Sequence, residues 1–211
     1  GVKVCTFTDF SFSFAAVISG ILHAVDNGAD VVNLSLGGGF PKAGNGRFVG
    51  FMDADYKTDI ACTADALTRL DAGWDIVIGS RKIAGAQIGN QPRAYRRLGS
   101  IAFNRYLHFL LPVLGQYKDT QCGFKFFTRR AAQEIFSRQV IERFMFDAEV
   151  LFLAQQLGFR VVEIPVVWSS DHDTRTRIIE SIVRNTADLL RIRRIHKNVA
   201  PLPPHPSEHG D

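Results

Sequence analysis

The chain has 211 residues and a formal net charge of +4; 46% of its residues are hydrophobic and 22% are charged. This length suffices for one α/β domain with a buried core, and the composition is that of a soluble globular protein. The charge is too small to mark a dedicated nucleic-acid binder, so we expect no nucleic-acid partner, although it suits a phosphate-bearing substrate or an anionic membrane surface.

The three cysteines indicate a reducing compartment. Cys5, Cys62 and Cys122 lie far apart and match neither a zinc-binding spacing nor a disulfide framework. The chain opens with no secretory signal, and no apolar run reaches the roughly 18 residues of a membrane span. We therefore expect a cytoplasmic protein, and a peripheral contact at the cytoplasmic face of a membrane stays open.

Residues 1–46 predict one helix between two short strands. A strand starts near Val2, and the helix spans Ala15 to Val25, where apolar residues recur at i, i+3, i+4 and i+7. Asn27-Gly28 ends that helix in the way a left-handed C-terminal residue does. A second strand follows from Ala29 to Leu36, and a Gly-rich loop leads to Gly46.

From residue 47 onward, predicted strands alternate with predicted helices. The strands lie at 47–52, at 74–79, within 118–127 and at 159–168. The helices lie at 58–73, 93–111, 129–136, 146–157 and 173–195. This alternation predicts an α/β fold with a largely parallel sheet and flanking helices.

Two local expectations belong to this part of the chain. Thr58 or Asp59 should cap the first helix, with Ile60, Leu67 and Leu70 facing inward and Gly73 closing it. The tail, residues 198–211, is rich in proline and poor in apolar residues, so we expect it to be disordered.

Two acidic residues, Asp53 and Asp55, follow directly on the apolar strand at 47–52. Ligands of open α/β sheets bind at the carboxyl ends of the strands, which is where this pair lies. Two carboxylates one residue apart can bind one hard cation, and Mg²⁺ or Mn²⁺ takes such oxygen ligands together with substrate phosphates. The alternative is a solvated turn that caps the next helix.

Five motifs occur along the rest of the chain. They are Phe51-Met52-Asp53-Ala54-Asp55, Gly79-Ser80-Arg81, Asp119-Thr120-Gln121-Cys122-Gly123-Phe124-Lys125, Phe146-Asp147-Ala148-Glu149 and Glu163-Ile164-Pro165-Val166-Val167-Trp168. In order and spacing they resemble family-2 glycosyltransferases of the dolichyl-phosphate glucosyltransferase and polyprenyl-phosphate mannosyltransferase branch, over about residues 47–195. The resemblance implies a GT-A (Rossmann-like) fold, and it identifies the acidic pair with the family's DxD element.

The resemblance also implies roles for individual residues. Asp55 would be the main ligand of Mg²⁺ or Mn²⁺, and Asp53 would contact the nucleotide ribose or the water shell of the metal. The remaining implied groups are a phosphate-binding set and a catalytic set on the acceptor-side loop. The first contains Arg81, Arg93 and Arg97, and the second contains Asp119, Gln121 and Lys125.

Plainer interpretations stand beside these roles. Arg81 can be a surface charge, and Asp119 can cap a turn. Asp147 and Glu149 start a helix, where acidic residues favour the helix dipole, so we interpret them as structural. We expect Trp168 to pack in the core or at the sheet edge.

The activity implied by the resemblance is sugar transfer from a nucleotide sugar, of the UDP-glucose or GDP-mannose class, to a polyprenyl or dolichyl phosphate. Transfer would invert the anomeric centre and depend on a divalent metal. A phosphate monoester is already an anion near pH 7, so such an acceptor needs little help from a general base. A non-catalytic glycosyltransferase remnant is the alternative.

Residues 1–38 do not match the first nucleotide-binding strands of that family. Gly28-Ala29-Asp30-Val31-Val32-Asn33-Leu34-Ser35-Leu36-Gly37-Gly38 and the helix before it instead resemble a fragment of subtilisin-like serine peptidases, without their catalytic triad. A peptidase fragment, inactive, is thus the third hypothesis for the chain. Either residues 39–46 join two truncated reading frames, the interpretation we favour, or the N-terminal segment docks on the sheet and replaces the missing unit.

Two helices bear on the lipid partner. Arg93, Arg96 and Arg97 precede the apolar and aromatic positions of 101–111, a pattern that fits either a bilayer interface or an ordinary buried helix. The arginines of 173–195 fit either anionic headgroups or a solvated face.

Overall fold

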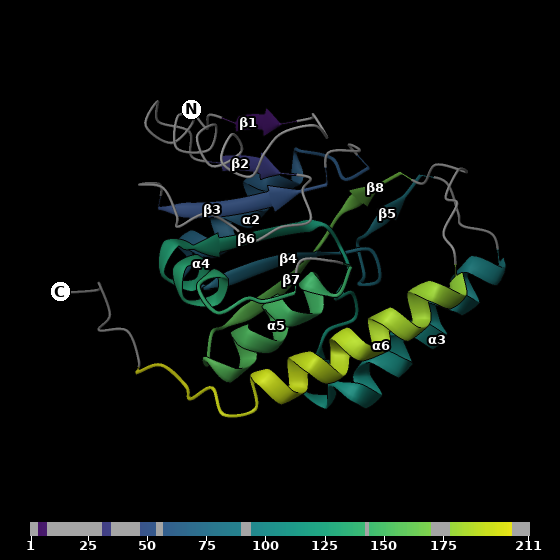
Figure 1. Cartoon of the computed structure of the whole chain (residues 1–211). Helices are drawn as coiled ribbons and strands as arrows, with labels where there is room; N and C mark the ends of the chain where they lie inside the picture. The colour runs from purple at the N-terminus through teal and green to yellow at the C-terminus, as the bar shows by residue number, and fades with distance from the viewer. Residues whose placement is uncertain are drawn as a thin grey trace.

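The computed structural model describes residues 4–7, 31–34, 47–53, 57–89, 94–141, 144–169 and 178–203, and for 4–7, 31–34, 94–97 and 178–182 it describes the main chain alone. The predicted helix at 15–25 lies outside these residues. Strands and helices follow each other in the order given in Figure 1. The strands are β1 (Val4–Phe7), β2 (Val31–Leu34), β3 (Phe48–Met52), β4 (Ile76–Ser80), β5 (Gln87–Ile88), β6 (Phe124–Thr128), β7 (Val161–Pro165) and β8 (Val167–Trp168). The helices are α2 (Cys62–Asp71), α3 (Ala94–Leu110), the 3₁₀ helix η1 (Pro112–Gln116), α4 (Arg129–Phe136), α5 (Phe146–Gln156) and α6 (Ile178–Ile195).

The central sheet has the strand order β3-β6-β4-β7. β4 and β7 pair in parallel, whereas β6 runs antiparallel to both β3 and β4. Three of these four strands therefore point the same way, which confirms the predicted α/β fold with a mostly parallel sheet. β1 and β2 form a parallel pair, and β2 lies beside β3 (Figure 1).

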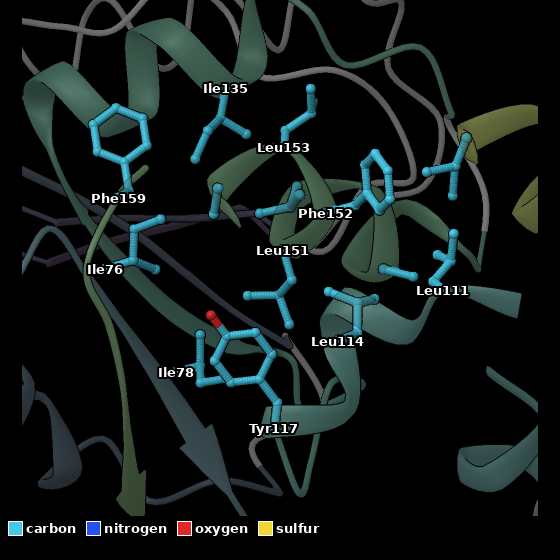
Figure 2. Close-up of a cluster of buried hydrophobic side chains, with 14 of the residues drawn as sticks. Ile76, Ile78, Leu111, Leu114, Tyr117, Ile135, Leu151, Phe152, Leu153 and Phe159 are labelled. Carbon is cyan, nitrogen blue, oxygen red and sulfur yellow. The ribbon is translucent and has the colours of Figure 1, made fainter. Parts of the chain in front are cut away.

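Helices cover both faces of the sheet because side chains alternate along each strand. On β4, Ile76 and Ile78 join the larger core cluster with α4 and α5, while Val77 joins a second cluster with Ala66 and Leu70 of α2. Figure 2 shows the larger cluster, in which side chains from β4, η1, α4 and α5 meet. The sheet thus separates two hydrophobic clusters, one on each face.

The start of α2 differs from the sequence prediction. The helix begins at Cys62 and its N-cap is Ala61, which makes no side-chain cap, although the Asp59 carboxylate accepts a hydrogen bond from the Ala61 N–H at 2.9 Å. Ile60 precedes the first turn and is 47% exposed, so the expectation that it faces inward was wrong, while Leu70 is buried as predicted. At the other end, Gly73 closes the helix with a φ of 91°.

Residues 198–203 are ordered against the core, contrary to the disordered tail expected there. Val199 and Leu202 pack against the larger cluster, and the Leu202 N–H donates to the carbonyl of Leu157 at 3.1 Å. The Arg130 guanidinium also donates to the Pro203 carbonyl at 2.7 Å. The packing of these two apolar side chains on one cluster therefore fixes a segment whose proline-rich composition had predicted disorder. Residues 204–211 lie outside the described residues.

Helices α3 and α6 lie side by side below the sheet in Figure 1, and the Tyr106 hydroxyl is 2.6 Å from the Thr186 hydroxyl between them. In the described ranges, no helix combines the length and the hydropathy that crossing a bilayer requires.

A buried polar network holds the C-terminal end of α6 against α5. The Glu149 carboxylate is fully buried, accepts hydrogen bonds from the N–H groups of Val140 and Ile141, and lies 2.7 Å from Nε2 of His196. Glu149 was interpreted from the sequence as structural, and its contacts are of that kind. Its loss would leave the N–H groups of Val140 and Ile141 and the buried His196 ring without this acceptor.

We expect Glu149→Ala to lower the free energy of unfolding by about 3 kcal/mol, because removing one partner of a buried charged network leaves the others unpaired. Urea denaturation followed by circular dichroism measures the change. Glu134→Ala is the matched control: Glu134 forms a partly exposed pair with Arg138 four residues on, and its loss should cost about 0.5 kcal/mol. Equal losses in the two variants would contradict this role of Glu149.

Candidate functional site

The candidate site forms where β3, β4 and β6 end at the same edge of the sheet. Because β6 runs antiparallel between its neighbours, its N-terminal end lies between the C-terminal ends of β3 and β4. The loop that enters β6, residues 118–123, therefore lies between Asp53, which follows β3, and Arg81, which follows β4. Three motifs singled out in the sequence meet at this point.

Arg81 and Asp119 form a bidentate ion pair at the centre of the site. The Arg81 Nε donates to Asp119 Oδ2 at 2.7 Å and its Nη2 donates to Asp119 Oδ1 at 2.8 Å. Nη2 also donates to the Gln121 carbonyl at 3.2 Å, and the guanidinium lies 5.3 Å from the centre of the Trp168 ring. Asp119 is 1% exposed and Arg81 26%, so the pair is neither a free surface charge nor a simple turn cap.

The charge of Arg81 decides the ionisation of Asp119. Burial alone would raise the pKa of this carboxyl, but the hydrogen bond and the positive charge of Arg81 outweigh burial and hold the pKa below its usual range. Asp119 is therefore a carboxylate at neutral pH. Lys82, 3.9 Å from Asp119, has its pKa lowered by burial, with Asp119 opposing that change.

Glu163 fixes the start of the same loop from β7. Its carboxylate accepts hydrogen bonds from the N–H groups of Lys118 and Asp119, each at 3.0 Å. The sequence placed Glu163 in a motif but assigned it no role. The two hydrogen bonds join residues 45 and 44 positions apart. A motif on one strand does not indicate which distant main-chain groups the side chains of that strand will contact.

Asp53 lies against the end of the loop. Its N–H donates to the Gly123 carbonyl at 2.8 Å. A Cβ atom on Gly123 would lie 2.1–2.2 Å from the atoms of the Asp53 carboxylate, so a side chain at 123 would displace that group. Asp53 itself is exposed.

The other half of the acidic pair, Asp55, lies outside the described residues. Within them, no group of three or more His, Cys, Asp or Glu side chains is arranged to hold a metal ion. A metal role for Asp53 and Asp55 therefore stays a prediction. Arg93 also lies outside the described residues, and of Arg97 only the main chain, in α3, is described.

Lys125 lies beneath the loop. Its ammonium is fully buried, donates to the Cys122 carbonyl at 2.7 Å and lies 2.5 Å from Asp147 Oδ1 of α5. Burial raises the pKa of Asp147, and the neighbouring Lys125 opposes that rise. Lys125 was predicted to line the acceptor side, which stays a prediction; Asp147 was interpreted as structural, and it pairs with Lys125.

The loop also holds polar atoms with no partner. Thr120 Oγ1 and both Nε2 and Oε1 of Gln121 are buried and make no hydrogen bond within the described part of the chain. Buried polar atoms are nearly always paired in folded proteins. Cys122 beside them cannot serve as a nucleophile at neutral pH, because burial raises the pKa of its thiol to about 12.

No protein-family model matches the chain. It is 38% identical over 120 residues to a dolichyl-phosphate β-glucosyltransferase of Trichomonas vaginalis, which covers 56% of this chain and 34% of the relative. It is 33% identical over 153 residues to the dolichyl-phosphate β-glucosyltransferase of Dictyostelium discoideum, covering 70% of this chain and 46% of the relative. The chain thus spans less than half the length of these curated relatives.

A solved structure shows a similar fold. Glucosyl-3-phosphoglycerate synthase from Mycobacterium tuberculosis, solved in complex with Mn²⁺, uridine diphosphate and glucosyl-3-phosphoglycerate, matches with a TM-score of 0.51 at 13% identity, covering 96% of this chain and 80% of that one. The peptidase-like resemblance of residues 1–38 stays a prediction. In sequence, the chain is similar to part of the dolichyl-phosphate β-glucosyltransferases, and in fold to glucosyl-3-phosphoglycerate synthase.

Proposed function

We propose that this chain carries the metal-binding and acceptor side of a glycosyltransferase that moves a sugar from a nucleotide sugar to a polyprenyl phosphate. The observation that carries the proposal is the meeting of Asp53, Arg81 and the 118–123 loop at one sheet edge. The relatives named for transfer to dolichyl phosphate support a polyprenyl acceptor and glucose as the sugar. A nucleotide sugar as the donor is supported by the resemblance of the acidic pair to a DxD element.

The residues present fit a divalent cation. Asp53 offers an exposed carboxylate at the carboxyl end of β3, and oxygen ligands of this kind suit Mg²⁺ or Mn²⁺. Asp55, two residues further on, would supply the second carboxylate. When bound there, the metal would neutralise charge on the departing diphosphate.

Arg81 is suited to hold a phosphate oxygen. Asp119 occupies its Nε and Nη2, so the guanidinium plane is fixed, while Nη1 has no hydrogen-bond partner among the described residues. A guanidinium that is fixed in advance and keeps one free nitrogen can donate to a phosphate oxygen without first being ordered. Gln121, with its unpaired carboxamide, is the second candidate for substrate contact.

The proposed reaction is one in-line displacement. An oxygen of the acceptor phosphate forms a bond to the anomeric carbon, and the bond from that carbon to the diphosphate breaks, with the electron pair leaving on the nucleoside diphosphate. The configuration at that carbon inverts. Because the acceptor is already anionic, the work of the protein is positioning and charge stabilisation rather than proton removal.

A remnant that folds but transfers nothing is the second candidate. Strands β1 and β2 lie along β3, where a nucleotide-binding unit would pair, yet their sequence matches no nucleotide-binding motif. Donor binding would then be weak or absent. It stays a proposal that the chain joins two units of different origin, residues 1–38 and residues 47–197.

A peripheral membrane contact would bring the site to a lipid acceptor. On α3, the large side chains of Leu98, Ile101 and Phe109 are exposed, with Phe109 at 78%. On α6, Val183, Leu190 and Ile195 are exposed beside Arg184, Arg191, Arg193 and Arg194. Exposed apolar groups next to arginines fit the interface of an anionic bilayer.

We expect Asp55→Asn to lower sugar transfer to a polyprenyl phosphate about a hundredfold in the presence of Mn²⁺, because a carboxylate ligand is lost; that factor corresponds to about 2.7 kcal/mol. Radiolabelled transfer from UDP-glucose and from GDP-mannose measures it. Asp71→Asn, an exposed carboxylate paired with Arg47 at the end of α2, is the control and should leave transfer unchanged. Equal activity of Asp55→Asn and the wild type would end the metal role, and a folded wild type without activity would favour the remnant.

We expect the chain to sediment with vesicles of phosphatidylserine and phosphatidylcholine and to bind vesicles of phosphatidylcholine alone more weakly. Phe109→Glu should reduce binding to the anionic vesicles about tenfold, because it places a charge in the apolar interface. Ile60→Glu, at an exposed apolar position outside α3 and α6, is the matched control and should bind as the wild type does. Equal binding of both variants would remove these helices from the membrane contact.

A further inference from the structure

Lys125 is a charged residue on the apolar face of the sheet. Alternation along β6 places Phe124 and Phe126 with α2, and Phe127 with α5. Lys125 shares the face of Phe127, is fully buried, and has its ammonium 5.5 Å from the centre of the Phe51 ring. Burial of an ammonium costs several kcal/mol, and an apolar side chain of similar size would often serve stability as well or better. Its presence therefore calls for another explanation.

The contacts of Lys125 connect α5 to the loop. In the described part of the chain, the ammonium donates to the Cys122 carbonyl and pairs with Asp147. The ammonium is fully buried and its Asp147 partner is 19% exposed, so Lys125 is engaged with protein groups and does not reach the surface itself. Lys125 thus links α5, through Asp147, to the 118–123 loop, through the Cys122 carbonyl; we call this link the Lys125 brace.

The braced end of the loop is the end that touches Asp53. Cys122 is followed by Gly123, whose carbonyl accepts the hydrogen bond from the Asp53 N–H. The Asp53 carboxylate occupies the space where a Cβ on Gly123 would lie. Because Cys122 and Gly123 are neighbours in the chain, a shift of the Cys122 carbonyl should move Gly123 and, with it, the Asp53 carboxylate that packs on Gly123.

The other end of the loop has anchors of its own. Glu163 holds the N–H groups of Lys118 and Asp119, and Arg81 holds the Asp119 carboxylate and the Gln121 carbonyl. Loss of the Lys125 brace should therefore disturb the Asp53 side and spare the Arg81 side. This division separates a local positioning role from a general role in stability.

We propose that Asp147 is a positioning residue: by holding the Lys125 ammonium under the Cys122 carbonyl, it sets the place of the Asp53 carboxylate and so the affinity of the site for a divalent cation. Asp147 touches no substrate in this scheme. The inference rests on the proposed function for the cation, whereas the link from Asp147 to Asp53 rests on the contacts alone.

The test uses the full chain and two readouts other than activity. Mn²⁺ binding is measured by electron paramagnetic resonance of the free ion, and exchange of the Asp53 amide hydrogen is measured by NMR. Asp147→Asn should weaken Mn²⁺ binding about tenfold and speed Asp53 amide exchange by a similar factor, each corresponding to about 1.4 kcal/mol. Exchange of the β4 amides, next to the Arg81 anchor, should stay as in the wild type. Asp65→Asn, the same change in the first turn of α2, is the matched control and should alter none of these values.

A double variant guards against a loss of folding. Lys125→Met with Asp147→Leu replaces the buried pair by apolar side chains, so the fold should be kept, yet the Cys122 carbonyl loses its donor. We expect the double variant to show the same weaker Mn²⁺ binding and faster Asp53 exchange. A folded double variant with wild-type Asp53 exchange would overturn the inference. If the wild type binds no Mn²⁺, the cation part of the proposed function fails, and the exchange measurement alone decides whether Asp147 positions Asp53.

Discussion

The antiparallel direction of β6 is the constraint on which the site depends. A strand inserted in that sense between β3 and β4 brings its entering loop to the edge where its neighbours end. Had β6 run parallel, residues 118–123 would lie at the opposite edge, about 15 Å away for a strand of five residues. The meeting of the Asp53, Arg81 and Asp119 motifs is therefore a consequence of topology rather than of their spacing in the chain.

The loop that results is held by charges from three directions. Glu163 reaches it from β7, Arg81 from the end of β4, and Lys125 from below, each through carbonyl, amide or carboxylate groups of the loop. Charged hydrogen bonds of this kind are stronger than neutral ones. A short segment without regular structure is thus anchored near both of its ends. Anchoring of this kind suits a site that has to stabilise charge without first rearranging.

Apolar periodicity and glycine positions predicted much of the fold. The bounds of α4 and the strands β3 and β4 lie within two residues of their predicted places, and Gly73 and Gly158 end their helices with φ of 91° and 82°. Periodicity indicates which residues share a face, but not the direction of a strand such as β6. Periodicity also placed the start of α2 before Cys62, and Ile60 was therefore wrongly expected to face inward as part of the helix.

The candidate site could be predicted in its members but not in its contacts. Arg81, Asp119 and Asp53 were named from the sequence and meet in the fold, whereas the Lys125–Asp147 and Glu163–Asp119 contacts join residues 22 and 44 positions apart. Such pairs depend on how elements stack, which no local pattern encodes. A lysine within Phe-Lys-Phe-Phe was a usable signal, since a charge on a buried strand needs a partner. In the segment 198–203 the sequence signal was misleading, because its overall composition predicted disorder while Val199 and Leu202 pack against the core.

The contact between Gly123 and Asp53 makes two positions that are 70 residues apart share one volume. A side chain at 123 would push the Asp53 carboxylate out of this space and into another rotamer. The sheet would be left as it is by such a change, because the displaced group is the end of a side chain and not main chain. The carboxylate, however, would leave the place where it lies at the edge of the sheet, so the absence of a side chain at 123 is a condition for the position of the acidic group at 53.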